Sequence, residues 1–337
     1  MIIPFEHHPQ AHCESGVTSN LLNFHGLSLS EPMTFGIGSG LFFGHIPFIK
    51  VNGVPGTTYR IYPGQIFKNV CSRLGIQYQS TQFRTSEQAM KMLDENLNQN
   101  IPTGCQVSVF HLPFLPEVFR FHFNAHNLIV FGKEQNTYHV SDPVMENKSI
   151  IESTDLAKAR FAKGFPEPKG RMYSISKIGK DYNLKKATYK GIAQTCFFLL
   201  SPPLPWFGVN AIKFLSKKIS EYPQKLTPRQ TSLYLGNIIR MQEEIGTGGA
   251  GFRYLYAAFL QEVGKTFNLN NFIELSEQMT GIGDKWRNMA YQTARICKAR
   301  SSDVGEVKDL SALLLEIYQL EKVFFADLKL ANKTLSH

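Results

Sequence analysis

The segment from residue 6 to residue 32, EHHPQAHCESGVTSNLLNFHGLSLSEP, contains four histidines and one cysteine. Both residue types bind metals, but the spacing of the histidines fits no recognised zinc motif, so we expect no metal here. A cysteine can instead act as a nucleophile once its thiol is ionised. Cys13 is therefore the candidate for chemistry. The histidines are His7, His8, His12 and His25.

The position of Cys13 favours ionisation of its thiol. Val17, Leu21 and Phe24 have helical spacing and predict a helix over residues 13–25, with Cys13 in its first turn. The helix dipole favours an anion at that end. A thiol there, next to a histidine, loses its proton more easily and becomes a nucleophile.

A second segment, HNLIVFGKEQNTYHVSDP, supplies the partners of such a thiol. Residues 126–131 and 137–142 read as two strands of a hairpin around the polar turn 132–136. In the register centred on that turn, His126 lies opposite Asp142, with Cβ atoms about 4.5–5.5 Å apart. An aspartate orients an imidazole and stabilises its charged form. A helix-start cysteine with a distant His–Asp pair is the layout of a papain-like thiol site.

Three stretches of the chain carry a resemblance. HCESGVTSNLLNFHGLSLSEPMTFGIGSGLFF resembles the amino-terminal signature of the butirosin biosynthesis protein H family, and LAKARFAKGFPEPKG and GTGGAGFRYLYAAFLQEV are similar to its other marks. The resemblance implies a papain-like domain with a cysteine nucleophile, followed by a helical domain. The best-known member moves an aminoacyl group from an acyl carrier protein to an aminoglycoside amine. The hairpin also resembles bacteriocin-processing cysteine peptidases, and the matching residues are Cys13, His126 and Asp142.

Three residues of the amino-terminal stretch, Gln10, His12 and Glu31, are candidates for binding the oxyanion or the substrate. The similar peptidases carry an oxyanion glutamine several residues before the cysteine, whereas here Gln10 lies three residues upstream. Gln10 and the backbone amides near Cys13 are therefore the candidate oxyanion donors. We expect His12 to pack near the nucleophile and Glu31, part of the family signature, to form a structural salt bridge.

The glycine-rich stretch FGIGSGLFFG, residues 35–44, lacks the lysine and the strand–loop–helix context of a phosphate-binding loop. We expect Gly38, Ser39 and Gly40 to form turns close to the thiol, where glycine lets a substrate approach the backbone.

A second glycine-rich stretch, GTGGAGFR at residues 246–253, joins two predicted helices. Gly248 and Gly249, the start of the next helix and Arg253 could hold a phosphate or a carboxylate. A helix stop followed by a turn is the equal alternative.

The chain has 337 residues, five cysteines without short spacings and a net charge of +9. The cysteine pattern suggests neither a disulfide framework nor a zinc site. No secretory signal is evident, so we expect a cytoplasmic protein. The apolar stretch 196–215 contains three prolines and reads as buried core rather than a membrane span. The excess of nine positive charges lies entirely after residue 170. It suggests an acidic partner for the second half, and a solvated basic face is the more common alternative.

The length and the patterns predict an α+β protein with two domains. We expect a papain-like catalytic domain at residues 1–170, a linker at 164–183 and an α-helical domain at 183–337. Residues 29–51 read as turns and short strands. Helices are predicted at 85–99, at 153–164 and after the Thr227–Pro228–Gln230 capping box.

The favoured function is a cysteine-dependent acyltransferase. Its donor would be an acyl thioester on the phosphopantetheine arm of an acyl carrier protein, and its acceptor an amine or hydroxyl of a small molecule, with no permanently bound cofactor. Further expectations are no nucleic-acid partner and a homodimer. Two alternatives stay open: a hydrolase of the same chemistry (peptidase, amidase or thioesterase) and a non-catalytic binding module of the same fold.

Overall fold

The structure is a computed structural model that describes residues 1–51, 53–299 and 304–335. The chain forms two compact units, and each is built from two separate segments. The sheet unit contains Met1–Thr34 and Ile66–Tyr182, and the helical unit contains Phe35–Gln65 and Asn183–His337. The protein is therefore α+β, with a helical carboxyl-terminal region.

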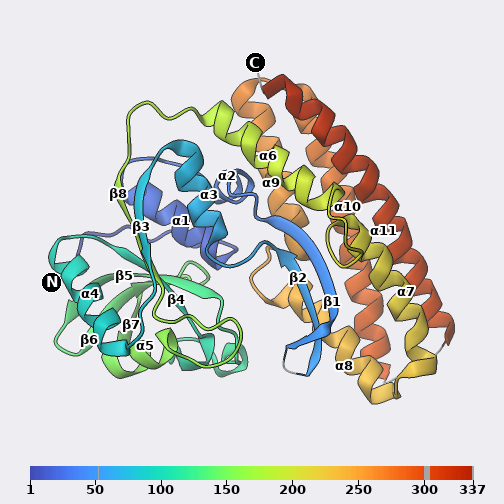
Figure 1. Cartoon of the computed structure of the whole chain (residues 1–337), viewed down its shortest axis with the longest axis horizontal. Helices are drawn as coiled ribbons and strands as arrows, with labels where there is room; N and C mark the ends of the chain where they lie inside the picture. The colour runs from blue at the N-terminus through green and yellow to red at the C-terminus, as the bar shows by residue number, and fades with distance from the viewer. Residues whose placement is uncertain (52, 300–303, 336–337) are drawn as a thin grey trace. The chain divides into compact units, whose positions relative to one another are not determined.

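The sheet unit is organised around six antiparallel strands in the order β3-β8-β4-β5-β6-β7 (Figure 1). Its two middle strands β4 and β5 are buried along nearly their whole length, as expected for strands covered on both faces. The strands are β3 (Gln77–Thr81), β4 (Thr103–Val107), β5 (His126–Glu134), β6 (Thr137–Ser141), β7 (Ser149–Glu152) and β8 (Met172–Lys177).

Helices pack on this sheet and anchor its loops. Helix α1 contacts β4, β5 and β8. Helix α4 contacts β4 and β5, and α5 contacts β4. The ten residues from Cys13 to Leu22 are all buried, so α1 is a central helix rather than an amphipathic surface helix. The first five helices of the chain are α1 (Cys13–Phe24), α2 (Glu31–Ile37), α3 (Gln65–Leu74), α4 (Ser86–Asn98) and α5 (Ser153–Arg160). The end of α2 from Phe35 onward and the first residue of α3, Gln65, belong to the helical unit.

Two polar side chains of α1 donate hydrogen bonds to backbone carbonyls inside the unit, which lowers the cost of burying so polar a helix. Ser19 Oγ donates to the Leu29 carbonyl at 2.6 Å, and Asn20 Nδ2 donates to the His8 carbonyl at 3.0 Å. Because unpaired polar groups are costly to bury, these bonds fix α1 to the segments on either side of it.

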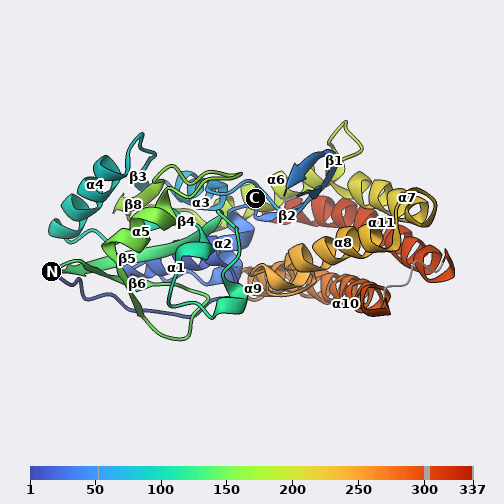
Figure 2. The same ribbon diagram turned by 90° about the horizontal axis from the view of Figure 1, so that it is seen from below.

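The helical unit combines long helices with one hairpin, β1 (Leu41–Val51) and β2 (Val54–Arg60). Helix α11 packs along α7 and α10, and α10 packs along α9, as Figure 2 shows from below. Helix α8 begins with the predicted capping box at Thr227. The helices are α6 (Leu184–Leu200), α7 (Val209–Lys225), α8 (Pro228–Ile239), α9 (Arg253–Phe267), α10 (Asn270–Ala299) and α11 (Val304–Ala331).

Three expectations need correction. The predicted linker 164–183 contains β8, which enters the sheet between β3 and β4. Residues 31–37 form helix α2 rather than turns, since Pro32 is compatible with a first helical turn. Residues 35–65 belong to the helical unit, so the predicted domain 1–170 is interrupted there.

The apolar segment 196–215 is not one continuous element. It comprises the end of α6, a loop with three prolines and the beginning of α7. Among the residues that the structure describes, no helix has both the length and the hydropathy that a bilayer span requires.

Candidate active site

Cys13 is the first residue of α1, and its side chain is buried. His12 caps this helix: its Nδ1 accepts a hydrogen bond from the Ser15 amide at 3.3 Å. The same nitrogen lies 2.8 Å from Ser15 Oγ. His12 thus packs beside the cysteine, as expected, and the cap fixes the turn on which the thiol stands.

His126 begins β5, and Asp142 follows the last residue of β6. Both are buried, and His126 Nε2 lies 2.7 Å from Asp142 Oδ2. The predicted pairing of these two side chains is therefore present in the structure.

The register of the hairpin differs from the predicted one. Ile129 pairs with Ser141, so continuing the ladder places Asp142 level with Leu128, two residues along the same face from His126. Diagonal neighbours are about 7–8 Å apart, a distance that an imidazole and a carboxylate span together. The cause is an irregularity in the ladder at Phe131 and a tight turn after Glu134.

The imidazole of His126 also lies close enough to the side chain of Cys13 for the two to influence each other's charge. Burial lowers the pKa of His126, but the Asp142 carboxylate, the hydrogen bond with it and the nearby Cys13 outweigh that effect and raise the pKa from 6.5 to about 10. At neutral pH the imidazole is therefore a cation beside the sulfur. The structure brings together Cys13, His126 and Asp142 from three separate segments.

Two residues missed in the sequence complete the surroundings of the sulfur. Asn127 Nδ2 lies 3.8 Å from Cys13 Sγ, and Tyr173 donates its hydroxyl to Asn127 Oδ1 at 2.9 Å. The Ala125 carbonyl also lies 3.8 Å from Sγ. The position of Asn127 directly after His126 is the one signal that could have marked it.

Glu31 has a different role from the expected salt bridge. Its buried carboxylate accepts hydrogen bonds from the amides of Ala11 and His12, each at 2.8 Å, and from Ser15 Oγ at 3.0 Å. Burial raises the pKa of Glu31, although these three bonds lower it. Glu31 therefore holds the chain that leads into Cys13.

Gln10 is attached to the turn that carries Asp142. Its amide donates to the Pro143 carbonyl at 2.6 Å, and its Cβ and that of Pro143 lie against Gly16 of α1. A Cβ added at Gly16 would lie 2.7 Å from the Pro143 Cβ, so only glycine allows this approach. The role of the Gln10 side chain as an oxyanion donor stays a prediction.

Gly38, Ser39 and Gly40 do form a turn, but in the helical unit. Ser39 Oγ donates to the Gly191 carbonyl at 2.9 Å, and a Cβ at Gly40 would collide with the ring of Phe35. These contacts explain the residues by packing, and a role beside the thiol stays a prediction.

The loop 246–253 is not built as the predicted anion site. Arg253 is fully buried, and its guanidinium donates to both carboxylate oxygens of Glu321 at 2.8 and 3.1 Å. The loop's own amides also have internal acceptors: Gly249 donates to Thr247 Oγ1. The amide of Ala250 donates to the Glu243 carboxylate at 3.2 Å. Carboxylates of the protein itself therefore occupy the places that a bound anion would need. Gly248 and Gly249 both have positive φ and turn the chain, which agrees with the alternative expectation of a turn after a helix.

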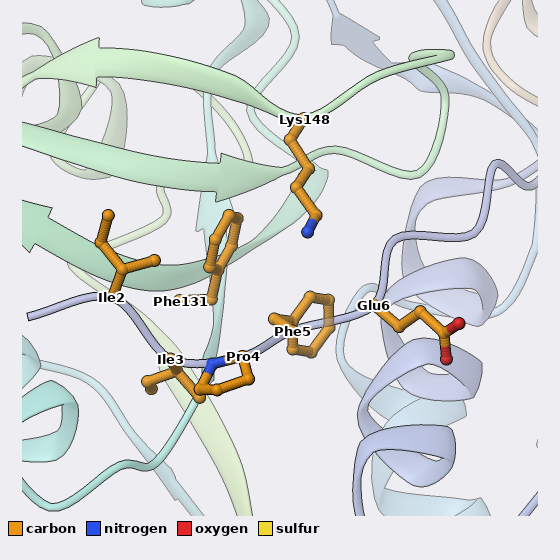
Figure 3. A pocket seen from close by; sticks show the side chains of 7 residues that line it. All are labelled: Ile2, Ile3, Pro4, Phe5, Glu6, Phe131 and Lys148. Atoms are coloured by element: carbon orange, nitrogen blue, oxygen red, sulfur yellow. The ribbon is translucent and has the colours of Figure 1, made fainter.

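A shallow groove of about 490 Å³ lies elsewhere in the sheet unit, between the amino-terminal segment and β5 (Figure 3). Phe5 and Phe131 both line the groove and stack with their ring centroids 5.5 Å apart. The Lys148 ammonium lies over the ring of Phe131. None of the candidate site residues lines it. Within the described ranges, no three side chains of His, Cys, Asp or Glu gather in a way that could hold a metal ion.

Comparison with known families shows that two family models match the chain, one on each side of residue 150. Residues 12–143 match the family model described as butirosin biosynthesis protein H, N-terminal, and residues 154–328 match the domain of unknown function DUF4872. The chain belongs to the butirosin biosynthesis protein H family. In this member, the match to the amino-terminal model begins one residue before Cys13 and ends one residue after Asp142.

None of the curated proteins matches this sequence. Among solved structures, this family member is similar to a protein from Bacillus anthracis described as a C39-like peptidase. The two are 14% identical with a TM-score of 0.39, and the match covers 53% of this chain and 98% of the other.

Proposed function

We propose that this protein is a papain-like, cysteine-dependent acyltransferase that works through an acyl-enzyme on Cys13. The observation that carries the proposal is a His126 imidazole that lies beside Cys13 and has its Nε2 2.7 Å from Asp142 Oδ2. A cation beside a sulfur at a helix start is the arrangement in which a thiol becomes a nucleophile at neutral pH.

The reaction would run in two halves. The Cys13 thiolate attacks the carbonyl carbon of a thioester, and the carbon–sulfur bond of the donor breaks, so that the donor leaves as a thiolate and takes the proton of His126. The acceptor amine or hydroxyl then attacks the acyl-enzyme and passes its proton to His126. The bond to Cys13 breaks, and the thiolate–imidazolium pair is restored.

The oxyanion of each tetrahedral intermediate needs hydrogen-bond donors. The amides of Ala11 and His12 are engaged by Glu31, and that of Ser15 by His12. In the described part of the chain, the Cys13 amide has no acceptor, because the first amides of a helix have none within it. We assign the oxyanion to this amide, with the Gln10 side chain as the second donor.

An acyl carrier protein is the proposed donor, and its phosphopantetheine arm would bring the thioester. Helices α6 and α7 support this choice: over their fully described lengths they carry seven lysines and one acidic residue, Glu221. Attraction between this basic surface and an acidic carrier would speed encounter and would weaken with salt. A carrier-dependent reaction of secondary metabolism also fits the proposed cytoplasmic location.

The test is incubation of the protein with an acylated carrier protein, followed by mass spectrometry of the Cys13 peptide. We expect an acyl mass on that peptide, absent in Cys13→Ala and His126→Ala, and its loss when a small amine is added. Cys71→Ser is the matched control, because Cys71 is a buried thiol whose pKa burial raises to about 12. No acylation of the wild-type protein by any thioester would refute the proposal.

The same experiment separates the alternatives. An acyl-enzyme that yields only free acid, whatever amine or alcohol is present, identifies a hydrolase. Absence of acylation together with alkylation of Cys13 by iodoacetamide at pH 6 no faster than that of free cysteine identifies a binding module.

A further inference from the structure

Asn127 is a buried side chain that touches the reacting sulfur. It is the second residue of β5, the residue is 2% exposed, and its Nδ2 lies 3.8 Å from Cys13 Sγ. An amide nitrogen in the core has to place both of its N–H groups on acceptors, since an unmade hydrogen bond there is costly. The contact with sulfur is therefore a matter of hydrogen bonding as well as packing.

The orientation of this amide follows from its other two neighbours. One is the Ala125 carbonyl oxygen, 3.1 Å away, which can only accept, so the atom facing it must be the nitrogen. The amide oxygen then faces the Tyr173 hydroxyl, which donates to it at 2.9 Å. Burial raises the pKa of Tyr173 well above its ordinary value, so the hydroxyl keeps the proton that it donates. With both ends fixed, the second N–H of Asn127 is directed to the sulfur.

The two states of Cys13 use this surrounding differently. A protonated thiol can donate its S–H to the Ala125 carbonyl at 3.8 Å, whereas a thiolate needs donors and is repelled by that oxygen. The Asn127 amide binds the Ala125 carbonyl and also offers an N–H to Sγ. It therefore weakens the acceptor that favours the thiol and supplies a donor that favours the thiolate.

We propose that Asn127 stabilises the thiolate of Cys13 through an amide N–H···S hydrogen bond, and that Tyr173 is the positioning residue that fixes this amide. The inference rests on the proposed function, in which Cys13 is the nucleophile. It adds a neutral donor to the charged partner His126. A hydrogen bond to a charged group changes an equilibrium constant by about tenfold or more, and the long N···S distance places this one at about tenfold.

The experiment measures alkylation of Cys13 by iodoacetamide from pH 5 to pH 10, with the modified peptide identified by mass spectrometry. For Asn127→Leu we expect the midpoint of the pH profile to rise by about one unit and the rate at pH 6 to fall about tenfold. Asn127→Asp, which replaces the donor by an acceptor, should react more slowly still at pH 6. Tyr173→Phe should slow the reaction about threefold, because the amide can then rotate.

Asn124 provides the matched control. It is an equally buried asparagine three residues earlier, but its Nδ2 donates to the carbonyls of Lys163 and Gly164 rather than to sulfur. Asn124→Ala should lower the melting temperature and leave the alkylation profile of Cys13 unchanged.

The outcomes distinguish this inference from the function on which it rests. If wild-type Cys13 reacts no faster than free cysteine at pH 6, or if His126→Ala does not slow it, the proposed nucleophile itself is wrong. If both conditions hold and folded Asn127→Leu keeps the wild-type profile, the thiolate hydrogen bond alone is overturned. If the Asn127 variants do not fold, Tyr173→Phe provides the test. A pH profile of Cys13 alkylation in Tyr173→Phe that equals the wild-type profile then overturns the proposal.

Discussion

Replacing Asp142 by asparagine would remove one charge from the site while nearly keeping its shape. The carboxylate is fully buried, with one oxygen 2.7 Å from His126 Nε2 and the other accepting from the Val144 amide at 3.2 Å. An asparagine side chain has one acceptor oxygen, so it can serve only one of these donors. The variant therefore tests whether the charge of Asp142 keeps the imidazole protonated.

The size of the effect follows from the pKa of His126, which stands at about 10 against an ordinary 6.5 in spite of burial. Asp142 is the largest of the causes that raise it, and a charge at ion-pair distance moves a pKa by about 1–3 units. We expect the midpoint of His126 to fall by about 2 units, which corresponds to about 3 kcal/mol of imidazolium stability.

The same shift predicts how stability depends on pH. Between pH 6.5 and about 10 the folded state keeps a proton that the unfolded chain has lost, so the contribution of His126 is complete below pH 6.5 and disappears as the pH rises to about 10. In Asp142→Asn the free energy of unfolding should fall less over this range.

The assay is a histidine NMR titration of the full chain, with the His126 signal assigned by its loss in His126→Gln. Asp94→Asn is the control, since Asp94 belongs to the same unit but binds Lys133 and Tyr138 instead. A His126 midpoint in Asp142→Asn within about 0.5 unit of the wild-type value would refute the reasoning, because the ion pair would then contribute little.

Three further predictions concern the supports of the two units. Gly16→Ala would stabilise an ordinary helix by about 1 kcal/mol. Here it should instead lower the free energy of unfolding in urea, because the added Cβ would lie 2.7 Å from the Pro143 Cβ. A gain in stability would contradict the close packing. Glu321→Ala should cost about 3–5 kcal/mol by leaving buried Arg253 unpaired, and a loss below about 1 kcal/mol in the same measurement would contradict the ion pair. Burial lowers the pKa of His45 to about 4, so the unfolded chain binds a proton there between pH 6.5 and 4 that the folded state does not. Stability should therefore fall as the pH drops through that range, and thermal melts of His45→Asn should show a smaller fall.

The parts of the site that could be predicted from the sequence depend on local signals. Helical spacing and the position of Cys13 at its start predicted α1, which runs from Cys13 to Phe24. Two β-rich runs around a polar turn predicted the hairpin, and strand alternation placed His126 and Asp142 on one face. The face of the sheet on which a side chain lies can be predicted even when the register is wrong by two residues, because side chains alternate with a period of two.

The register and the Asn127 contact could not be predicted, because both depend on where the chain departs from regular geometry. The irregularity at Phe131 shifts the pairing of the strands, and the positive φ of Gln135 places the turn later in the chain than predicted. The residue types phenylalanine and glutamine predict neither feature. Asn127 reaches the sulfur from a strand more than a hundred residues away, and its orientation is set by Tyr173 on β8. That strand lies inside the segment 164–183, which was predicted to be a linker.

The glycine-rich loop 246–253 shows why backbone freedom alone does not identify a binding site. Glycines allow amides to converge, and the sequence displays that freedom in the loop before α9. Whether converging donors bind a ligand depends on whether the protein supplies its own acceptor, and here Glu243 and Glu321 do so from seven and sixty-eight positions away. The same criterion applies at the start of α1: Glu31 engages the amides of Ala11 and His12, whereas the proposed function assigns the oxyanion to the amide of Cys13.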